Sequence, residues 1–438
     1  MKKIFIALFL LLTFNSANAF NCDGSIDVLE IECDALNDLY ISLDVASSTL
    51  PEAVKTAWGG ATEENICATN EADKGIFCDE NLNVTRLILS NVSLSGSLSE
   101  SIGDLVNLQT LALNNNSLMG AIPESIGELV NLRSLIFRFN DFSENIPESI
   151  GGLTDLENLY LQSNNLTGTI PESIGDLTNI QALYLSANNL SGTIPESISE
   201  LTTLQYLILH RNNLTGIIPE SIIVNLTSLQ LLYLSNNSLS GTIPDSIGGL
   251  ANLRGLSLSR NDFTGSIPQS LGELSLLENL YLDDNNLTGT IPQSLGALLN
   301  LERLYLYDNN LTGIIPQSFG ELSSLQSLRL NGNNLTGNIP DSFGNLNNLS
   351  DFWFQDNFIF GEFPDLTISA IPVAGTFPNL RFQNNCISPN EGSNATAVNQ
   401  WLTERAPDPY GLNTQRPDLN TCLDVFIEYD LIYANDFD

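Results

Sequence analysis

Residues 159–179 read LYLQSNNLTGTIPESIGDLTN, and closely similar stretches return at 183–203 and 280–300. Aligning these stretches gives a unit LxxLxLxxNxLxGxIPxSIGxLxx of 24 residues. The unit begins near Val84 and recurs twelve times, to about Asp365, and a partial copy follows at 379–388. The sixth unit carries one extra residue near Ile223 and Val224. A constant period of this length predicts a solenoid of stacked, nearly identical units.

Each fixed letter of the unit has a physical reason. The alternation in Leu159 and Leu161 predicts a short strand with one buried face, and its repetition predicts a parallel sheet that gains one strand per unit. The recurring asparagine, as in Asn164, predicts a buried amide that satisfies backbone groups of adjoining units. The Ile-Pro pair ends the extended segment, and the Ile and Leu of SIGxL bury the returning limb.

This unit resembles the leucine-rich repeat, and its LxGxIP half resembles the plant-type form of that repeat. The family includes plant receptor ectodomains and secreted inhibitors of cell-wall hydrolases. The resemblance implies an α/β leucine-rich-repeat solenoid, a curved right-handed superhelix with a parallel β-sheet on its concave face and disulfide-stapled caps.

The flanks divide the chain further. Lys2 and Lys3, the apolar IFIALFLLL and the sequence ANA at 17–19 predict a signal peptide over 1–19. Residues 20–83 resemble the family's N-terminal cap, with Gly75, Ile76 and Cys78 at its Gly-Val-x-Cys motif. The twelve repeats occupy 84–365, and 366–438 hold the partial last repeat and a C-terminal cap, for which we expect a short helix over 394–407.

Six cysteines lie outside the repeats: Cys22, Cys33, Cys67, Cys78, Cys386 and Cys422. An even number in an exported chain predicts disulfides, and six cysteines allow fifteen pairings. Because a dozen strands separate the two caps, a bridge should join cysteines of the same end. We therefore expect Cys67–Cys78 and Cys386–Cys422, with Cys22–Cys33 left by elimination.

Charge and hydropathy exclude several functions. The formal charge is −36, from 51 acidic and 15 basic residues, so nucleic acid and anionic lipid are poor partners. Apart from the signal peptide, no apolar stretch is long enough to form a transmembrane span. The sequence also lacks a catalytic constellation: His210 is its single histidine, which excludes His-pair metal sites, and we expect a surface contact role for it. We expect no enzyme activity and no cofactor.

One acidic group supports an alternative. Asp283, Asp284, Asp308 and Asp356 are expected on exposed strand positions of nearby units, where they would hold Ca²⁺ or flank a sugar. The alternative function is thus a carbohydrate-active enzyme or a Ca-dependent binder. A solvated acidic patch explains the same residues more simply in so acidic a chain.

The variable letters predict a binding surface. Tyrosines recur in the slot between the two leucines, and most arginines of the repeats fall in the four columns expected on the concave face. Exposed tyrosine and arginine together are typical of recognition surfaces. The expected ligand-binding residues are Tyr160, Tyr184, Tyr206, Tyr233, Tyr281, Tyr305, Tyr307, Trp353, Arg138, Arg211, Arg260, Arg303 and Arg329.

The sequence therefore predicts an exported, monomeric binding protein that is secreted, attached to the cell surface or, in a Gram-negative host, periplasmic. Its expected partner is an extracellular protein, peptide or glycan, bound in the manner of an inhibitor or an adhesin. Ice binding is a further alternative, but the sequence lacks the regular threonine columns that it would need.

Overall fold

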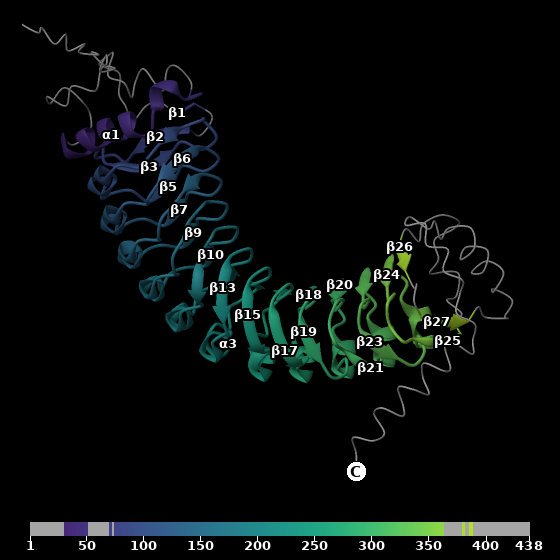
Figure 1. Ribbon diagram of the computed structural model, residues 1–438. Helices are drawn as coiled ribbons and strands as arrows, with labels where there is room; N and C mark the ends of the chain where they lie inside the picture. The colour runs from purple at the N-terminus through teal and green to yellow at the C-terminus, as the bar shows by residue number, and fades with distance from the viewer. Residues whose placement is uncertain (1–29, 51–69, 72–73, 363–378, 382–384, 389–438) are drawn as a thin grey trace, which may run out of the picture. The chain divides into compact units, whose positions relative to one another are not determined.

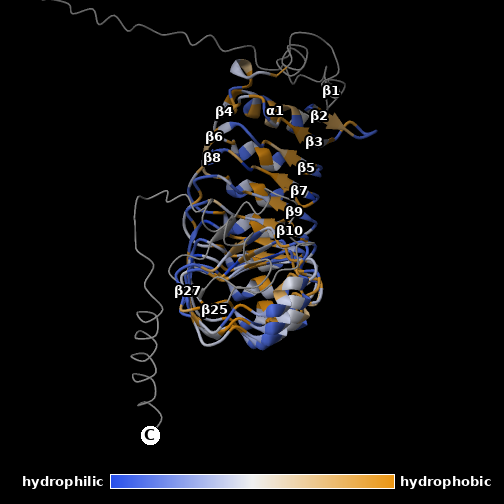
Figure 2. Ribbon diagram, turned by 90° about the vertical axis from the view of Figure 1, so that its right-hand side faces the viewer, coloured by the Kyte–Doolittle hydropathy of each residue, from blue (hydrophilic) through white to orange (hydrophobic). Residues whose placement is uncertain are grey.

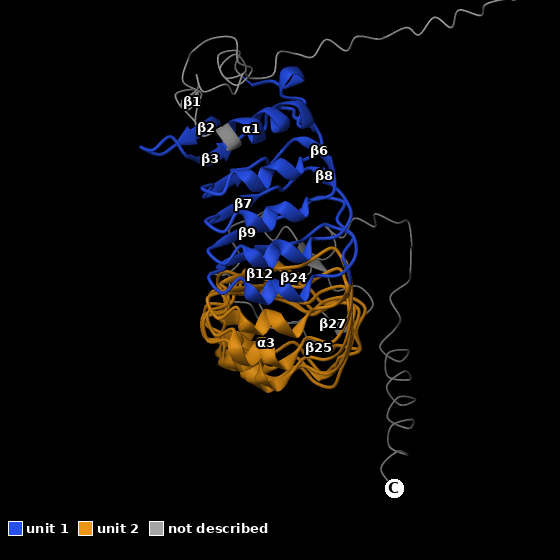
Figure 3. Cartoon of the chain, turned by 90° about the vertical axis from the view of Figure 1, so that its left-hand side faces the viewer, with its two compact units in different colours: residues 1–191 blue, residues 192–438 orange. Residues whose placement is uncertain are grey.

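The computed structural model describes residues 30–50, 70–71, 74–362, 379–381 and 385–388. The expected signal peptide and the expected helix over 394–407 lie outside these residues. The chain divides into two compact units, residues 1–191 and 192–438 (Figure 3). Each unit is described by itself.

Unit 1 begins with a cap and continues as stacked repeats (Figure 1). The cap has helix α1 (Glu30–Ser42), the turn η1 (Val45–Ser47) and strands β1 (Asn70–Glu71) and β2 (Lys74–Cys78). β2 pairs antiparallel with the first repeat strand, and the repeat strands then pair in parallel, with Leu135 beside Leu159. These strands are β3 (Val84–Ile88), β5 (Thr110–Ala112), β7 (Ser134–Ile136), β9 (Asn158–Tyr160) and β10 (Ala182–Tyr184).

Unit 2 repeats the same arrangement. Equivalent residues of successive strands lie side by side, as Leu280 does with Leu304. The strands are β12 (Tyr206–Ile208), β14 (Leu231–Tyr233), β16 (Gly255–Ser257), β18 (Asn279–Tyr281), β20 (Arg303–Tyr305), β22 (Ser327–Arg329), β24 (Asp351–Trp353) and β26 (Asn379–Arg381).

A helical turn closes each repeat. Its isoleucine, leucine or phenylalanine is buried against the sheet leucines, so hydrophobic residues gather on the strands and the turns (Figure 2). Most turns are 3₁₀ helices: η3 (Glu100–Asp104), η4 (Glu124–Glu128), η5 (Glu148–Gly152), η6 (Glu172–Asp176), η7 (Glu196–Glu200), η8 (Asp245–Gly249), η9 (Gln269–Glu273), η10 (Gln293–Ala297), η11 (Gln317–Glu321) and η12 (Asp341–Asn345). The sixth repeat has the α-helix α3 (Glu220–Asn225) instead. Its extra residue converts a 3₁₀ turn into an α-helical one.

The recurring asparagine does what its position predicts. Asn164 is buried, and its Nδ2 donates to the carbonyls of Phe137 and Leu161 at 3.1 and 3.0 Å. Its Oδ1 accepts from the N–H of Phe142 at 3.1 Å. One side chain thus satisfies three backbone groups that the bend would otherwise leave unpaired, two of them in the preceding repeat.

A second set of short strands follows each bend. In unit 1 these are β4 (Ser95–Gly96), β6 (Ser117–Gly120) and β8 (Asp141–Phe142), and β11 (Ser191–Thr193) reaches the boundary of the units. In unit 2 they are β13 (Asn213–Gly216), β15 (Ser238–Thr242), β17 (Asp262–Ser266), β19 (Asn286–Thr288), β21 (Thr312–Ile314), β23 (Asn334–Thr336), β25 (Phe360–Glu362) and β27 (Cys386–Ser388).

These second strands place threonine and serine residues side by side in pairs. The register pairs Thr242 with Thr264, Ser266 with Thr288 and Thr290 with Thr312. Thr264 and Thr312 each donate to a glycine carbonyl of the preceding repeat, at 3.2 and 3.3 Å. Hydroxyl residues therefore lie side by side in pairs on these strands. Asn286 follows Thr264 and Asn334 follows Thr312 in the next repeat, so these pairs do not continue into a third strand.

The cap is fastened to the first repeats by one buried carboxylate. Glu32 of α1 is 1% exposed, and it accepts from the N–H of Val84 at 3.0 Å and from Asn107 at 3.3 Å. Burial raises the pKa of this carboxyl. Cys33 and Cys78 are both disulfide-bonded. The side chains of the other four cysteines lie outside the described residues, so all three expected pairings stay predictions.

Candidate functional site

The face of the main sheet opposite the helical turns carries the predicted binding residues, and we call it the strand face. Each repeat contributes four columns to it, represented by Asn158, Tyr160, Gln162 and Ser163. The strands are shorter than expected: β9 ends at Tyr160, so the third and fourth columns lie in the bend and not on a strand.

The fourth column has left-handed backbone. φ is between 51° and 63° at every described member from the first to the twelfth repeat: Asn91, Asn115, Phe139, Ser163, Ala187, Arg211, Asn236, Arg260, Asp284, Asp308, Gly332 and Asp356. Asparagine, aspartate and glycine tolerate this conformation, whereas phenylalanine and arginine are uncommon there. The sequence gives no direct signal for it, because so many residue types occupy the column.

The second column is less exposed than predicted. Tyr160, Tyr184, Tyr233, Tyr281 and Tyr305 are half-buried, and Ala112, Ile208 and Ser257 are buried. The expectation that this whole slot faces solvent was wrong, because neighbouring side chains on strands about 4.8 Å apart cover one another.

In unit 1 the strand face holds two tyrosine rings in tilted contact and an arginine that makes no ion pair among the described residues. The rings of Tyr160 and Tyr184 have centroids 5.0 Å apart. Arg138 is exposed, and Phe139 beside it is 50% exposed. None of the four columns of this unit carries an acidic residue from Arg86 to Ala187.

In unit 2 aromatic rings and one guanidinium form a continuous stack. The ring centroids of Tyr281 and Tyr305 are 4.9 Å apart. Arg329 follows, 4.6 Å from the ring of Tyr305 and 4.0 Å from that of Trp353. Tyr307 lies 6.2 Å from Tyr305 at the side of the stack. The structure thus brings four predicted residues into one row.

Arg329 is held by a partner that the sequence did not reveal. Asp351 accepts from its Nε at 2.9 Å and pairs with its Nη2 at 2.8 Å, and it also accepts from Ser327 at 2.6 Å. Asp351 stands in the first column, which was searched for aromatic and basic residues only. The guanidinium is covered on both faces and paired at its edge, so it stiffens the row.

The other arginines of this face differ in their contacts. Arg303 donates to Asn279 at 3.0 Å and lies 3.5 Å from Glu302, and Arg260 lies 3.6 Å from Asp284. Arg211 is exposed and makes no ion pair among the described residues.

The hydroxyls of Tyr281 and Tyr307 remain protonated at neutral pH. Burial raises the pKa of Tyr281 to about 12. Burial and the hydrogen bond to Asp283 raise the pKa of Tyr307 to about 12. Tyr281 Oη lies 3.1 Å from Asn279 Oδ1, to which it donates. These phenols therefore act as hydrogen-bond donors at neutral pH.

The acidic group does not have the arrangement that the alternative function needs. Asp283 was expected to be exposed but is 4% exposed, and it accepts from Ser259 at 2.6 Å and from Tyr307. Because its carboxylate accepts these two hydrogen bonds inside the protein, it is not presented to a ligand. Asp284, Asp308 and Asp356 belong to the fourth column, in the bend and not on a strand. In the part of the chain that the structure describes, no group of three or more His, Cys, Asp or Glu is placed to hold a metal ion.

His210 also departs from its expected exposure. It is only partly exposed, and burial followed by the charge of Arg211 lowers the pKa of its imidazole. The ring is therefore neutral at physiological pH and leaves Arg211 as the cation of this bend.

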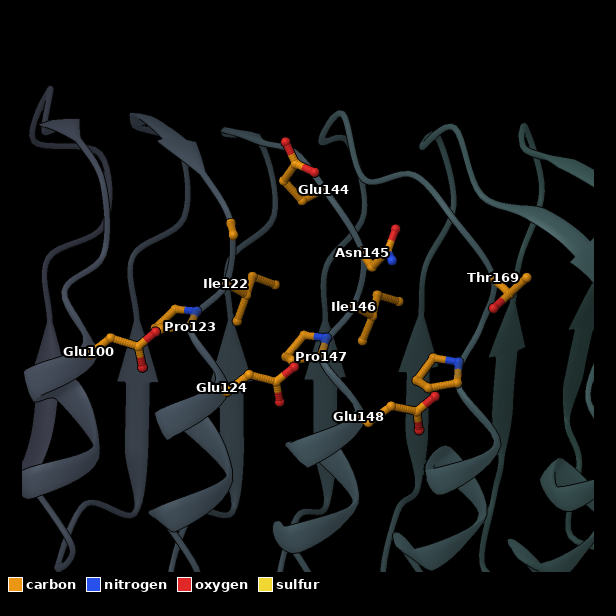
Figure 4. A pocket seen from close by; sticks show the side chains of 12 residues that line it. Glu100, Ile122, Pro123, Glu124, Glu144, Asn145, Ile146, Pro147, Glu148 and Thr169 are labelled. Atoms are coloured by element: carbon orange, nitrogen blue, oxygen red, sulfur yellow. The ribbon is translucent and has the colours of Figure 1, made fainter.

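One pocket, of about 330 Å³, lies away from the strand face (Figure 4). Ile122, Pro123, Ile146 and Pro147 form its wall, and Glu100, Glu124 and Glu148 lie along one edge. Two of these carboxylates are used structurally, since Glu100 accepts from the N–H of Ser125 and Glu124 from that of Ser149, each at 3.2 Å. The same residue types recur in each repeat along this pocket, so we attribute the pocket to the repeat and not to a specific ligand.

Comparison with known proteins gives the family. Models of the leucine-rich repeat match residues 107–129, 131–153 and 275–335, and a model of a leucine-rich-repeat region matches 159–263. The chain is a plant-type leucine-rich-repeat protein. No curated protein sequence matches it.

Solved structures of plant receptors share its fold. A TDR receptor is 34% identical, with a TM-score of 0.66 over 69% of this chain and 52% of that one. The plant peptide hormone receptor RGFR1, solved in complex with RGF2, is 32% identical, with a TM-score of 0.64 over 72% of this chain and 57% of that one. This leucine-rich-repeat chain spans little more than half the length of these receptor chains.

A plant ice-binding protein has the same fold with a different ligand. It is 25% identical, with a TM-score of 0.50 over 83% of this chain and 96% of that one. The fold therefore does not choose the ligand, and the side chains of this chain must. Among the residues described here, no helix is long and apolar enough to cross a membrane.

Proposed function

We propose that this protein is an exported, monomeric binding protein that recognises an extracellular protein, peptide or glycan through its strand face. The observation that carries the proposal is the row Tyr281, Tyr305, Arg329 and Trp353, in which each side chain contacts the next. A rigid row loses little conformational entropy on binding, which is where affinity is usually lost. The receptors of similar fold, which bind peptide hormones, support a ligand-binding role.

The first experiment finds a ligand and locates its site. The mature protein is immobilised and used to capture binding partners from the medium of the organism that produces it. In parallel, the mature protein is screened for binding on a glycan array. Tyr281→Ala and Tyr305→Ala are then titrated by calorimetry against Glu148→Gln and Glu172→Gln on the helical turns. We expect each tyrosine variant to lose about 2 kcal/mol, about 30-fold in Kd, and the glutamate variants to lose almost nothing.

The opposite pattern, with loss only in the glutamate variants, would move the site to the other side of the repeats. We also propose that the protein lacks hydrolase activity. Turnover of a plant or algal polysaccharide that disappears in Asp308→Asn would instead support the enzyme alternative.

A second candidate function rests on the paired hydroxyl residues of the second strands. The paired hydroxyls of β15, β17 and β19 lie on strands about 4.8 Å apart, close to a repeat of the ice lattice, and a plant ice-binding protein shares the fold. Inhibition of ice recrystallisation tests it directly. Loss of inhibition in Thr264→Tyr, with Tyr281→Ala unaffected, would support this second function over the first.

A further inference from the structure

The bend after β12 combines an arginine with neutral polar neighbours. The N–H of Arg211 donates to the carbonyl of Ser235 at 2.9 Å, and that of Asn212 to the carbonyl of Asn236 at 3.2 Å. Ser235 and Asn236 therefore lie directly beside Arg211 in the next repeat. Tyr206 on β12 and Tyr233 on β14 supply two half-buried rings on the same face.

The charge of Arg211 is not paired with a carboxylate among the described residues, although the chain has many more acidic than basic residues. Arg133, Arg254, Arg260, Arg303 and Arg329 each have a carboxylate within 4.0 Å. Arg211 has none among the described residues, although the sequence holds 51 acidic residues against 15 basic ones. In the sixth and seventh repeats, no acidic residue stands in the four columns of the strand face.

The backbone of Arg211 has the left-handed conformation of every described member of the fourth column. Its φ is 58°, and the same column holds Asn236 in the next repeat, a residue that adopts this conformation more readily. Arginine at this point stabilises neither the bend nor an ion pair. The conformation belongs to the repeat, and Asn236 shows that a neutral residue can occupy it, so the fold does not need the charge of Arg211.

We propose that Arg211 binds the carboxylate of an acidic polysaccharide, and this inference rests on the strand-face function proposed above. The planar guanidinium matches a carboxylate with two parallel hydrogen bonds. The hydroxyl of Ser235 and the amide of Asn236 suit sugar hydroxyls, and the rings of Tyr206 and Tyr233 suit the apolar faces of sugars. The hydroxyl and amide groups beside the guanidinium favour a sugar over an apolar peptide side chain.

The experiment compares three probes by titration calorimetry on the full mature protein. The first is a linear oligomannuronate, the second is the same oligosaccharide with its carboxylates reduced to alcohols, and the third is polyglutamate. We expect the wild type to bind the oligomannuronate at least about tenfold more tightly than the reduced form, as removal of one charge-assisted contact would require. Equal affinity for the two, no affinity for either, or tighter binding of polyglutamate would each overturn the proposal.

Two variants separate binding from folding. Arg211→Asn should weaken oligomannuronate binding about tenfold, leave the reduced form unaffected and keep or raise Tm, because asparagine relieves the backbone. Arg254→Gln removes the same charge from an arginine that is already paired to Glu278, and it should change the affinity by less than about twofold. A lower Tm in Arg211→Asn, or equal losses in both variants, would show a structural or nonspecific role and overturn the proposal.

The same titrations distinguish this inference from the function on which it rests. If Tyr281→Ala and Tyr305→Ala weaken binding of a captured partner while Arg211→Asn does not, the strand face binds its ligand and the anion subsite is wrong. If none of these variants affects that partner, the strand-face function itself is wrong.

Discussion

Some residues of the fourth column have a backbone conformation that is unfavourable for their residue type. Most members are asparagine, aspartate, serine or glycine, but Phe139 adopts φ of 56° with half of its surface exposed. A bulky residue in the left-handed region raises the free energy of the fold by about 1–2 kcal/mol. The sequence predicted the partner position, the buried Asn140, from its recurrence, but the residue before it varies too much to predict its backbone.

Replacing Phe139 by asparagine should therefore stabilise unit 1. We expect Phe139→Asn to raise the free energy of unfolding by about 1 kcal/mol, since little buried surface is lost. Urea denaturation measures the change. The reciprocal variant Asn115→Phe, in the same column one repeat earlier, should lower it by a similar amount, and stabilisation by both variants would refute the backbone explanation.

Among the structural elements, the bend is the part that the sequence predicted best. The asparagine side chain satisfies three backbone groups, as its recurrence in a polar slot implied. The charged residues were predicted less well. Asp283 has the same spacing as an exposed residue of the third column, but Ser259 and Tyr307 enclose it, and those contacts depend on side chains of two other repeats.

Removal of the buried asparagine amide should lower the free energy of unfolding more than is usual for a residue in a loop. Asn164→Ala leaves the N–H of Phe142 and the carbonyls of Phe137 and Leu161 without their partner, and we expect a loss of about 3 kcal/mol. Asn165→Ala is the matched control, because the neighbouring side chain is exposed and should contribute less than about 0.5 kcal/mol. Comparable losses in chemical denaturation would contradict this explanation.

The buried carboxyl of Asp283 should make stability depend on pH. Burial raises its pKa above the ordinary 3.8, so the folded state holds the proton more tightly than the unfolded state. Its contribution to stability is full below pH 3.8 and is lost as pH rises through the folded-state pKa. Asp283→Asn should thus raise Tm at pH 7 and change it little near pH 3. A variant less stable than the wild type at pH 7 would mean that the hydrogen bonds from Ser259 and Tyr307 outweigh the cost of the buried charge.

For the whole molecule, the sequence was sufficient for the fold class because one unit recurs twelve times, and every copy repeats the same evidence. The site was less predictable. Columns of tyrosine and arginine were visible in the alignment, whereas the stack of Arg329 between Tyr305 and Trp353 depends on packing between repeats. The caps are unique sequences, so the periodic argument does not extend to them.

The disulfides are the prediction that belongs to this scale. Non-reducing peptide mapping of the mature protein should find Cys22–Cys33, Cys67–Cys78 and Cys386–Cys422. A bridge between any of the first four cysteines and either of the last two is incompatible with a dozen intervening strands, at about 4.8 Å each, and would refute the solenoid as well as the pairing.

The hydrogen bonds of the recurring asparagine reach only its own repeat and the one before it, as Asn285 shows with Leu258 and Leu282. A gene that loses or duplicates one 24-residue segment by unequal recombination therefore encodes a protein whose new junction matches every old one. Within unit 2, deletion of 256–279 joins Gly255 to Leu280. Asn285 then keeps its bond to Leu282 and meets Leu234 and Leu239 of the preceding repeat, which Asn261 met before. The number of repeats can therefore change by one at a time during evolution. Such a change extends or shortens the ligand-binding row and leaves the buried residues that support it unchanged.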